Sequence, residues 1–348
     1  MNPLNTSGRL DQLPPDSSSS GCNDNLNSWE EAMNKMYTYF YLLLFIPGLL
    51  LNTTALWVLC RHISKRTKAV IFMINLALAD LVHILSLPLR IYYYFTHSWP
   101  FGPYVCMFCF YLKYLNMYAS IVFLVCISMQ RCVFLLDPFA ARRWRRRYDL
   151  LISLVVWVVV GLACSPFILM RSGSNSSSLN SASNIKPTCF KDLPTRHVSL
   201  PQAISIIAFA QLFGFLIPLA CILYINSTCQ SNKYHVKQTN SEKRRALRMV
   251  LSCCSLFLLC FAPYHLNFLL YMMVQQDIVS HCATRVAVQQ FHPVSLCLAS
   301  MSCCLNPLLY YFLTAEFRMH LSRRTSSFSS SSLPHRLMSM ESSCSDRE

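Results

Sequence analysis

The sequence has few of the residues and motifs that soluble enzymes use. It contains only 7 glycines in 348 residues and no Gly-x-Gly-x-x-Gly motif, which argues against a dinucleotide-binding domain. A P-loop, a His-Glu-x-x-His zinc motif and the Gly-x-Ser-x-Gly turn of hydrolases are also absent from it. Charged residues make up only 13% of the chain, whereas 54% are hydrophobic. We therefore predict a membrane protein that is not an enzyme.

Long apolar runs occupy most of the chain. A helix needs roughly 20 mostly apolar residues to cross a bilayer, and such runs lie near 37–60, 68–94, 103–136, 148–170, 200–229, 242–274 and 284–312. The last run is the weakest, because Gln289, Gln290 and His292 interrupt it, and this leaves a six-span alternative open. We predict an all-α membrane protein whose fold is a seven-transmembrane helix bundle.

This reading divides the chain into three parts. Residues 1–36 are expected to be an extracellular, disordered N-terminus, and 37–313 the seven-transmembrane domain. Residues 314–348 are expected to form a short amphipathic eighth helix and a Ser-rich cytoplasmic tail. The first residues lack the apolar core of a signal peptide, so the first span is expected to direct its own insertion.

Basic residues are concentrated on one side of the predicted spans. The net charge of +15 comes mostly from the first, third and fifth connections and from the C-terminal tail. The positive-inside rule places these segments in the cytoplasm and the N-terminus outside the plasma membrane. A basic chain can also bind nucleic acid, but here the charge lies between membrane spans and suits the anionic inner leaflet. We expect membrane lipid, and no nucleic acid, as a partner.

The predicted outer side carries the candidates for covalent modification. Most of the 18 cysteines fall inside spans, where a thiol behaves as a small hydrophobic group. The outer side is oxidising and holds Cys22, Cys106, Cys189 and Cys282. Asn5 and Asn175 begin Asn-x-Ser/Thr sequons there and are candidates for glycosylation.

The most informative motif lies near the end of the seventh run, where 306–310 reads Asn-Pro-Leu-Leu-Tyr. A proline inside a helix removes one backbone hydrogen bond and makes the helix deformable there. Behind seven spans, this motif resembles that of the rhodopsin-like (class A) G-protein-coupled receptors. The Asn-Leu-Ala-Leu-Ala-Asp string at 75–80, Trp157 and Pro218 fit the same resemblance. It implies a two-state receptor that activates a heterotrimeric G protein, with arrestin and receptor kinases acting on the tail.

The resemblance also assigns roles to particular residues. It implies disulfides joining Cys106 to Cys189 and Cys22 to Cys282. It implies a sodium or water pocket around the buried charge of Asp80, although water and helix hydroxyls alone could satisfy this carboxylate. The other members of that pocket would be Asn116, Ser120, Ser302 and Asn306. No other metal or cofactor is expected. Switching and G-protein coupling would involve Arg131, Phe261, Pro263, Pro307 and Tyr310.

Two motifs depart from the class pattern. The third span ends in Gln130-Arg131-Cys132 where an acidic residue usually precedes the arginine, and Lys243 stands where an acidic partner often begins the sixth span. We hypothesise that losing this ion pair raises basal signalling. Phe261 replaces the usual tryptophan switch.

The strings at 86–94 and 109–120 resemble the purinoceptor-like branch, and within it purinergic receptors grouped with receptors for lysophosphatidylserine. Cations in the outer halves of the spans have no acidic partner in the second to fourth spans, which predicts an anionic ligand. The resemblance makes this ligand a lysophospholipid, with its acyl chain in a groove near Phe167, Ile206, Phe209 and Phe213. The candidate ligand-binding residues are Arg90, Tyr94, Lys113, Tyr114, Met117, Tyr118, Arg171 and His265.

Three other functions remain open at this point. A nucleotide receptor would use similar cations and aromatic residues but would need no lateral groove. A decoy receptor would fit the altered Gln130-Arg131-Cys132 motif. A transporter is disfavoured, because the sequence shows no internal repeat and no chain of ionisable residues through the membrane.

Overall fold

The computed structural model describes the backbone of residues 17–63, 70–137, 139, 143–175, 189–190, 200–231, 241–276, 278–279 and 281–313. Side chains are described for these residues except 17–28, 62–63, 166–175, 200, 202–203, 241–243, 245 and 311–313. Seven helices in this part of the chain are long and apolar enough to cross a membrane. The last of them, Cys282–Tyr310, has the lowest mean hydropathy at 1.3. The six-span alternative is therefore wrong.

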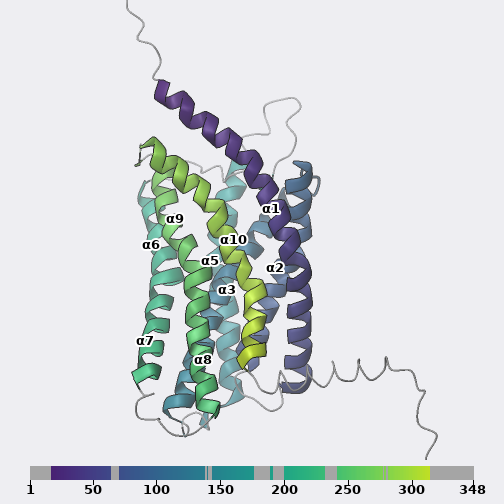
Figure 1. The fold of residues 1–348 in the computed structure, drawn as a ribbon, viewed down its shortest axis with the longest axis vertical. Helices are drawn as coiled ribbons and strands as arrows, with labels where there is room; N and C mark the ends of the chain where they lie inside the picture. The colour runs from purple at the N-terminus through teal and green to yellow at the C-terminus, as the bar shows by residue number, and fades with distance from the viewer. Residues whose placement is uncertain are drawn as a thin grey trace, which may run out of the picture.

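The spanning helices stand side by side in an upright bundle (Figure 1). The first four are α1 (Ser17–Val58), α2 (Val70–Thr96), α3 (Gly102–Leu136) and α5 (Arg146–Asn175). The fifth span combines α6 (Leu200–Gln211) with α7 (Ile217–Ser231), and the sixth combines α8 (Ser241–Leu256) with α9 (Ala262–Gln275). The seventh span is α10 (Cys282–Leu313). Helix α3 contacts α2, α5, α7 and α8, so it forms the centre of the bundle.

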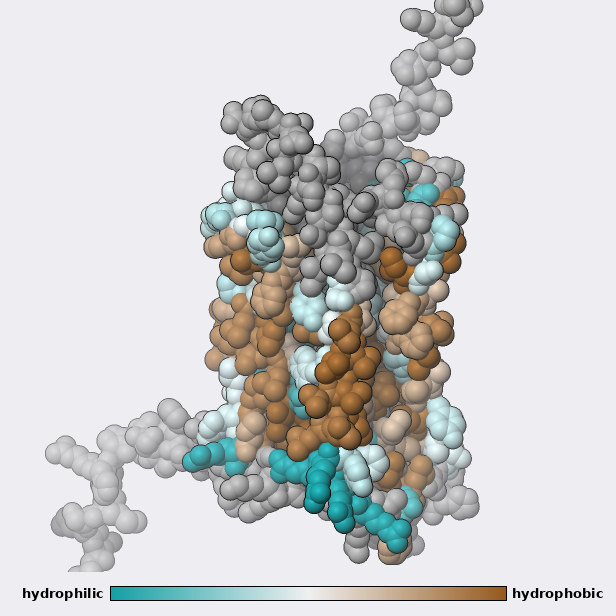
Figure 2. All heavy atoms as spheres, turned by 180° about the vertical axis from the view of Figure 1, so that it is seen from behind, coloured by the Kyte–Doolittle hydropathy of each residue, from teal (hydrophilic) through white to brown (hydrophobic). Residues whose placement is uncertain are grey.

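The outer surface of the bundle is apolar, as a lipid-facing surface must be. On α5, Leu150, Leu154, Val158 and Leu162 are all exposed and recur every four residues along one face. Figure 2 shows the hydrophobic residues as a band along the middle of the molecule, with hydrophilic residues gathered at one end. The opposite face of α5 is joined to α2, because Trp157 Nε1 donates to Asn75 Oδ1 at 2.8 Å.

Helix α1 begins well before the predicted start of the first span. It starts at Ser17, whereas residues 1–36 were expected to be disordered. The segment from Trp29 to Met36 contains no proline or glycine, and Lys35 Nζ pairs with Glu31 Oε1 at 2.8 Å one helical turn away. Such i, i+4 pairs support a helix. The expectation therefore needs correction from Ser17 onward, and residues 1–16 lie outside the described part.

Two spans are interrupted just before a proline. One turn of π-helix, η2 (Leu212–Leu216), precedes Pro218, and another, η3 (Phe257–Phe261), precedes Pro263. Proline cannot donate the hydrogen bond to the preceding turn, so the helix accommodates it by widening locally. The turn before Pro263 holds the side chain of Phe261 fully buried inside the bundle. The helix of the sixth span is therefore irregular just before Pro263, and the switching role of this proline stays a prediction.

The two ends of the bundle differ in their cross-links. At one end, which we call the disulfide end, Cys106 is bonded to Cys189 as the resemblance implied. Cys282, at the start of α10, is also disulfide-bonded, but the Cys22 side chain is outside the described part and that pairing stays a prediction. The opposite end, which we call the Arg131 end, is closed by a buried apolar cluster of Cys132, Ile225, Cys229, Leu247 and Val250 from α3, α7 and α8.

Candidate functional site

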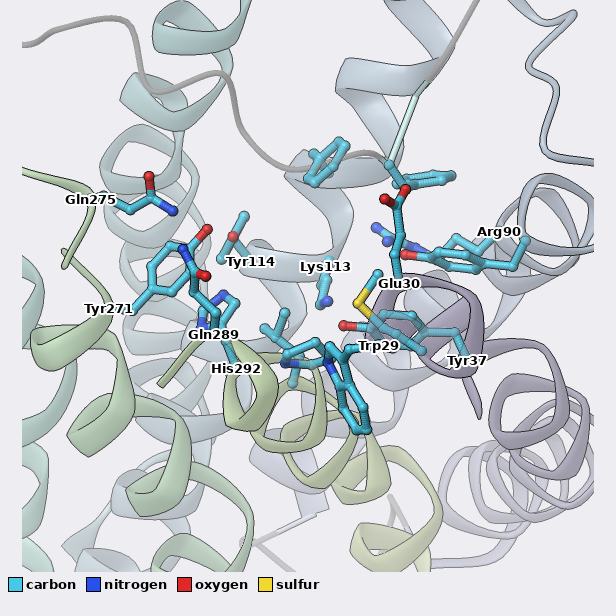
Figure 3. Close-up of a pocket in the computed structure, with 16 residues that line it drawn as sticks. Trp29, Glu30, Tyr37, Arg90, Lys113, Tyr114, Tyr271, Gln275, Gln289 and His292 are labelled. Carbon is cyan, nitrogen blue, oxygen red and sulfur yellow. The ribbon is translucent and has the colours of Figure 1, made fainter. Parts of the chain in front are cut away.

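A cavity of about 240 Å³ opens at the disulfide end. Its walls come from α1, α2, α3, α9 and α10, and Phe190, next to Cys189, contributes a further side chain. We call it the cationic cavity, because it holds both Arg90 and Lys113 (Figure 3). Of the residues predicted to bind ligand, Arg90, Tyr94, Lys113 and Tyr114 line this cavity.

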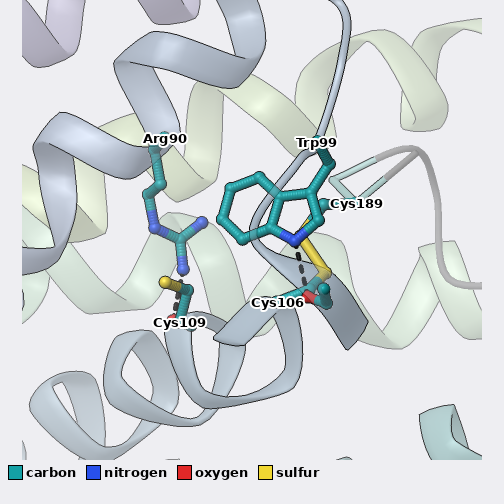
Figure 4. Close-up of a disulfide and its surroundings, with 6 residues drawn as sticks. Arg90, Trp99, Cys106, Cys109 and Cys189 are labelled. Atoms are coloured by element: carbon teal, nitrogen blue, oxygen red, sulfur yellow. Dashed lines mark hydrogen bonds between the residues drawn. A yellow bond between two sulfur atoms is a disulfide. The ribbon is translucent and has the colours of Figure 1, made fainter. Parts of the chain in front are cut away.

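Arg90 forms part of the wall and is almost wholly buried, with 1% of its surface exposed. Its Nη2 donates to the carbonyl oxygen of Cys109 at 2.5 Å, so the guanidinium joins α2 to α3 (Figure 4). The guanidinium also lies 4.5 Å from the ring centroid of Phe190, a cation–π distance. Its Nε remains buried without a hydrogen-bond partner. Arg90 therefore joins two helices, and its Nε–H is still available to a ligand.

Lys113 lies one turn after Cys109 on α3, and its ammonium points into the cavity (Figure 3). Among the described residues, none forms an ion pair or a hydrogen bond with Nζ. A second, smaller cavity lies beside Lys113 and is lined by His83, Met117 and Ser300. Both ring nitrogens of His83 are buried there without partners. Lys113 is thus the strongest candidate for direct contact with an anion.

Aromatic rings hold the disulfide side of the cavity in shape. Phe190 packs edge-on against Tyr93 at 5.3 Å and against Trp99 at 5.3 Å. Trp99 is fixed in turn, because its Nε1 donates to the carbonyl oxygen of Gly102 at 2.7 Å (Figure 4). Sequence reasoning did not select Phe190, although its position next to an outer cysteine was a usable signal. The disulfide therefore positions a ring that covers Arg90.

Glu30 is the second lining residue that the sequence analysis missed. It belongs to the early turns of α1, and it lines the mouth of the cavity together with Trp29 and Met33. Figure 3 shows its side chain on the same side of the cavity as Arg90. Because residues 1–36 were predicted to be disordered, Glu30 was not among the predicted ligand-binding residues. The cavity is therefore cationic in its interior and carries an acid at its mouth.

Tyr118 and His265 were predicted to bind ligand, but they do not line the cationic cavity. Their rings pack against each other at 5.9 Å, and His265 also stacks on Phe215 at 5.1 Å. Gly214 makes this arrangement possible, because a Cβ at that position would lie 2.5 Å from the Tyr118 ring. Tyr271 and His292 take their place in the lining, and their rings stack at 4.0 Å.

A separate polar cluster surrounds Asp80 in the middle of the bundle. Asn116 Nδ2 and Asn306 Nδ2 each donate to the carboxylate at 2.9 Å, and Ser120 Oγ lies 3.4 Å from it. We call these four residues the Asp80 cluster. Ser302 donates to the carbonyl oxygen of Ala299 at 2.7 Å, within its own helix, so its hydroxyl does not point to Asp80. Asn306 Oδ1 is buried without a partner, and oxygen atoms are the ligands that hard cations use. The oxygen atoms of Asp80, Ser120 and Asn306 would be the ligands of a sodium ion here, and this site stays a prediction.

Two of the predicted switch residues, Pro307 and Tyr310, follow Asn306 along α10 toward the Arg131 end. Tyr310 is fully buried, and its hydroxyl donates to the carbonyl oxygen of Met73 at 3.2 Å. Pro307 lies inside α10 between Asn306 and Tyr310. Gln130, which replaces the usual acid before Arg131, donates to Asp149 on α5. Described side chains of α3, α7 and α8 pack together and close this end of the bundle.

Several predicted positions lie outside the described part. The side chains of Arg171, Phe167 and Asn175 are not described, nor are Asn5 and the C-terminal tail from 314 onward. The rings of Phe209 and Phe213 pack at a tilt with their centroids 4.9 Å apart, and both are about half exposed on the outside of the fifth span. They are not part of the cationic cavity, so the acyl-chain groove stays a prediction.

The chain is similar to known receptors over most of its length. The sequence profile of the seven-transmembrane receptors of the rhodopsin family matches residues 51–310. Purinoceptor 10 of Mus musculus is 51% identical over 89% of this chain and 92% of the relative. G-protein coupled receptor 174 of Homo sapiens is 48% identical over 83% of this chain and 86% of the relative. Lysophosphatidic acid receptor 6 of Mus musculus is 31% identical over 80% of each chain.

Proposed function

Because the chain belongs to the rhodopsin family of seven-transmembrane receptors, we propose that it is a receptor for an anionic lysophospholipid and that lysophosphatidylserine is its first candidate ligand. The family consists of multi-pass membrane receptors that bind small ligands and couple to G proteins, and it is not a family of enzymes. The disulfide end then faces the cell exterior and the Arg131 end faces the G protein. The branch favours the G-protein class that activates Rho.

The single observation that carries this proposal is the state of Lys113. A buried ammonium is costly unless a counter-charge compensates it, and the described residues provide no ion pair for Nζ. The unpartnered Nε of Arg90 lies in the wall of the same cavity. A phosphate or carboxylate group that accepts hydrogen bonds from both side chains would remove this cost.

Glu30 favours a headgroup with both signs of charge. Lysophosphatidylserine carries a phosphate, a carboxylate and an ammonium group, whereas lysophosphatidic acid has no ammonium. With the anionic groups at Lys113 and Arg90, the ammonium can approach the Glu30 carboxylate at the cavity mouth. The same acid repels ligands that carry only negative charge.

The size of the cavity supports a lipid that lies partly outside it. Its volume of about 240 Å³ lies below the ~300–1,000 Å³ usual for small-molecule sites. A headgroup fits this space, but a long acyl chain must leave it between helices. This is the reason to keep the lateral groove near Phe209 in the proposal.

A nucleotide is the second candidate. A relative named as a purinoceptor and the flat Tyr271–His292 pair, stacked at 4.0 Å, favour it. A base could stack on these rings while its phosphates contact Lys113. Such a ligand would need no lateral groove and would gain nothing from Glu30.

The test is G-protein activation in cells that express the receptor at matched surface levels. Lysophosphatidylserine, its short-chain analogue, lysophosphatidic acid and a panel of nucleotides are applied to the wild type and to Lys113→Met. Lys35→Met is the control, because Lys35 is exposed and already paired with Glu31. We expect a response to long-chain lysophosphatidylserine that falls by about 100-fold or more in Lys113→Met, and no change in the control.

The other outcomes separate the alternatives. A response to nucleotides alone keeps the cationic cavity and rejects the lipid. Equal potency of the short-chain and long-chain lipids rejects the groove. Silence toward every ligand, with normal surface expression, speaks for a decoy receptor.

A further inference from the structure

The residue before Arg131 makes an unusual contact. Gln130 stands where the class usually has an acid, and its Nε2 lies 3.2 Å and 3.3 Å from the two carboxylate oxygens of Asp149. Gln130 belongs to α3, and Asp149 belongs to the first turn of α5. An acid is therefore present beside this position, but it comes from the next span.

Asp149 also contacts the segment that connects α3 to α5. Trp144 Nε1 donates to Asp149 Oδ1 at 2.6 Å, and the Trp144 ring packs edge-on against Tyr148 at 5.9 Å. The carboxylate thus joins α3, the connecting segment and α5 through three hydrogen-bond contacts. We call Gln130, Trp144 and Asp149 the Asp149 clamp.

The burial of Asp149 indicates that these contacts matter energetically. Its side chain is fully buried, with 0% of its surface exposed. A buried carboxylate is costly unless hydrogen bonds and positive potential compensate it. The clamp donors supply the hydrogen bonds, and the N-terminus of α5 supplies a favourable dipole. Exposed arginines precede Asp149 closely in the sequence, namely Arg143, Arg145, Arg146 and Arg147.

The clamp lies at the end of the bundle where a G protein would dock. Gln130 is adjacent in sequence to Arg131, and Cys132 belongs to the apolar cluster that closes this end. A contact that fixes Gln130 therefore fixes the last turns of α3 in the closed arrangement. It also fixes Trp144, which belongs to the connecting segment.

We propose that Asp149 is the positioning residue that replaces the missing acid of α3: it ties the connecting segment between α3 and α5 to Gln130 and thereby holds the Arg131 end closed. This inference rests on the G-protein coupling implied by the family and does not depend on the identity of the ligand. It changes our expectation from the sequence, because the restraint lost at position 130 is supplied by α5. Basal signalling of the wild type is then low.

The first experiment measures the clamp without any G protein or ligand. Purified full-length receptor in lipid nanodiscs is treated with trypsin, which cuts after the arginines of the connecting segment. We compare the wild type, Asp149→Asn, Gln130→Glu and the double variant that carries both changes. Asp149→Asn removes the charge, and Gln130→Glu keeps the side-chain length but places two carboxylates together.

Each single change is expected to accelerate cleavage by about tenfold, the effect of losing a hydrogen bond to a charged group. The double variant restores one acid and one amide at the same contact, so its cleavage rate returns to near that of the wild type. A merely local effect of Asp149 on α5 would not be rescued by a change on α3. Cleavage of Asp149→Asn at the wild-type rate, or a double variant as fast as the singles, would overturn the proposal.

The second experiment measures basal G-protein activation at matched surface expression. Asp149→Asn is expected to raise the basal signal at least about threefold, and the double variant to lower it again. Asp137→Asn is the control, because Asp137 is an acid of the same connecting segment outside the clamp; its Oδ1 accepts from the backbone N–H of Phe139 at 2.9 Å. Basal signalling unchanged in Asp149→Asn, from a receptor that responds to ligand, contradicts the proposal. If all variants are silent, the proposed coupling fails, and the trypsin result decides on the clamp alone.

Discussion

The cationic cavity and the Asp80 cluster differ in the partners that they provide for a charged side chain, Lys113 in the first and Asp80 in the second. Around Asp80, two asparagine amides donate to the carboxylate at 2.9 Å, so the protein itself provides the hydrogen bonds that water would otherwise supply. In the cationic cavity, the Lys113 ammonium has no ion pair among the described residues, although it comes from the same helix, α3, as Asn116. The carboxylate has hydrogen-bond donors within the fold, whereas the described residues give the ammonium no ion-pair partner.

Arg90 is intermediate between Asp80 and Lys113 in the partners that the fold provides for its charge. It shares the cavity with Lys113, yet its guanidinium is held by the Cys109 carbonyl group and the Phe190 ring. A charge with internal partners contributes to stability, because its removal leaves those partners buried without a hydrogen bond. A charge without them contributes to binding. We therefore expect substitution of Arg90 to lower the stability of the protein and substitution of Lys113 to lower its response to ligand.

The largest effect is expected when Arg90 and Lys113 are compared directly. Arg90→Ala should lower the free energy of unfolding by about 3 kcal/mol or more, because it leaves a cavity and an unpaired Cys109 carbonyl. Lys113→Met should change it by less than about 1 kcal/mol, since it removes a charge without an internal counter-charge. Thermal unfolding of both purified variants measures this. Equal destabilisation by the two changes would show that the cations are equivalent.

Asp80→Asn tests the other half of the comparison. If sodium binds the Asp80 cluster, wild-type stability should rise with sodium concentration, by about 1.4 kcal/mol at ten times the dissociation constant. Asp80→Asn removes the charge that attracts the cation and should abolish this dependence, while potassium should have no such effect on either protein. Thermal unfolding across a sodium series, at constant ionic strength, provides the measurement. A sodium dependence that survives in Asp80→Asn places the ion elsewhere.

Glu30→Gln sharpens the account of the cavity mouth. The change should raise the potency of lysophosphatidic acid relative to lysophosphatidylserine by about tenfold, the effect of one charge contact at a partly exposed site. Glu31→Gln is the matched control, because Glu31 pairs with Lys35 on the exposed face of the same helix. Concentration–response curves for both lipids measure the ratio. A ratio unchanged by Glu30→Gln would remove Glu30 from the recognition of the headgroup.

Sequence patterns predicted the parts of this molecule that depend on one helix at a time. The seven spans followed from apolar runs, and the spacing of Asn116 and Ser120, one turn apart, puts both on one face of α3. Contacts between segments were harder to predict. Glu30 reaches the cavity only because α1 continues beyond the apolar run, and Asp149 approaches Gln130 through the packing of α5 on α3. Phe190 reaches Arg90 from a connecting segment. Spacing along the chain carries no information on such approaches.

The smallest effect is expected for two serines, both of which were predicted from the sequence to belong to the pocket around Asp80. Ser120 Oγ lies 3.4 Å from the Asp80 carboxylate, whereas Ser302 Oγ donates to its own helix at 2.7 Å. Ser120→Ala should therefore weaken the sodium-dependent stabilisation by less than about tenfold in apparent affinity, and Ser302→Ala should leave it unchanged. The same sodium series reads out both variants. A larger effect of Ser302→Ala would mean that its hydroxyl turns toward Asp80 when the ion binds, and the cluster would then be assembled by the ion and not by the helices alone.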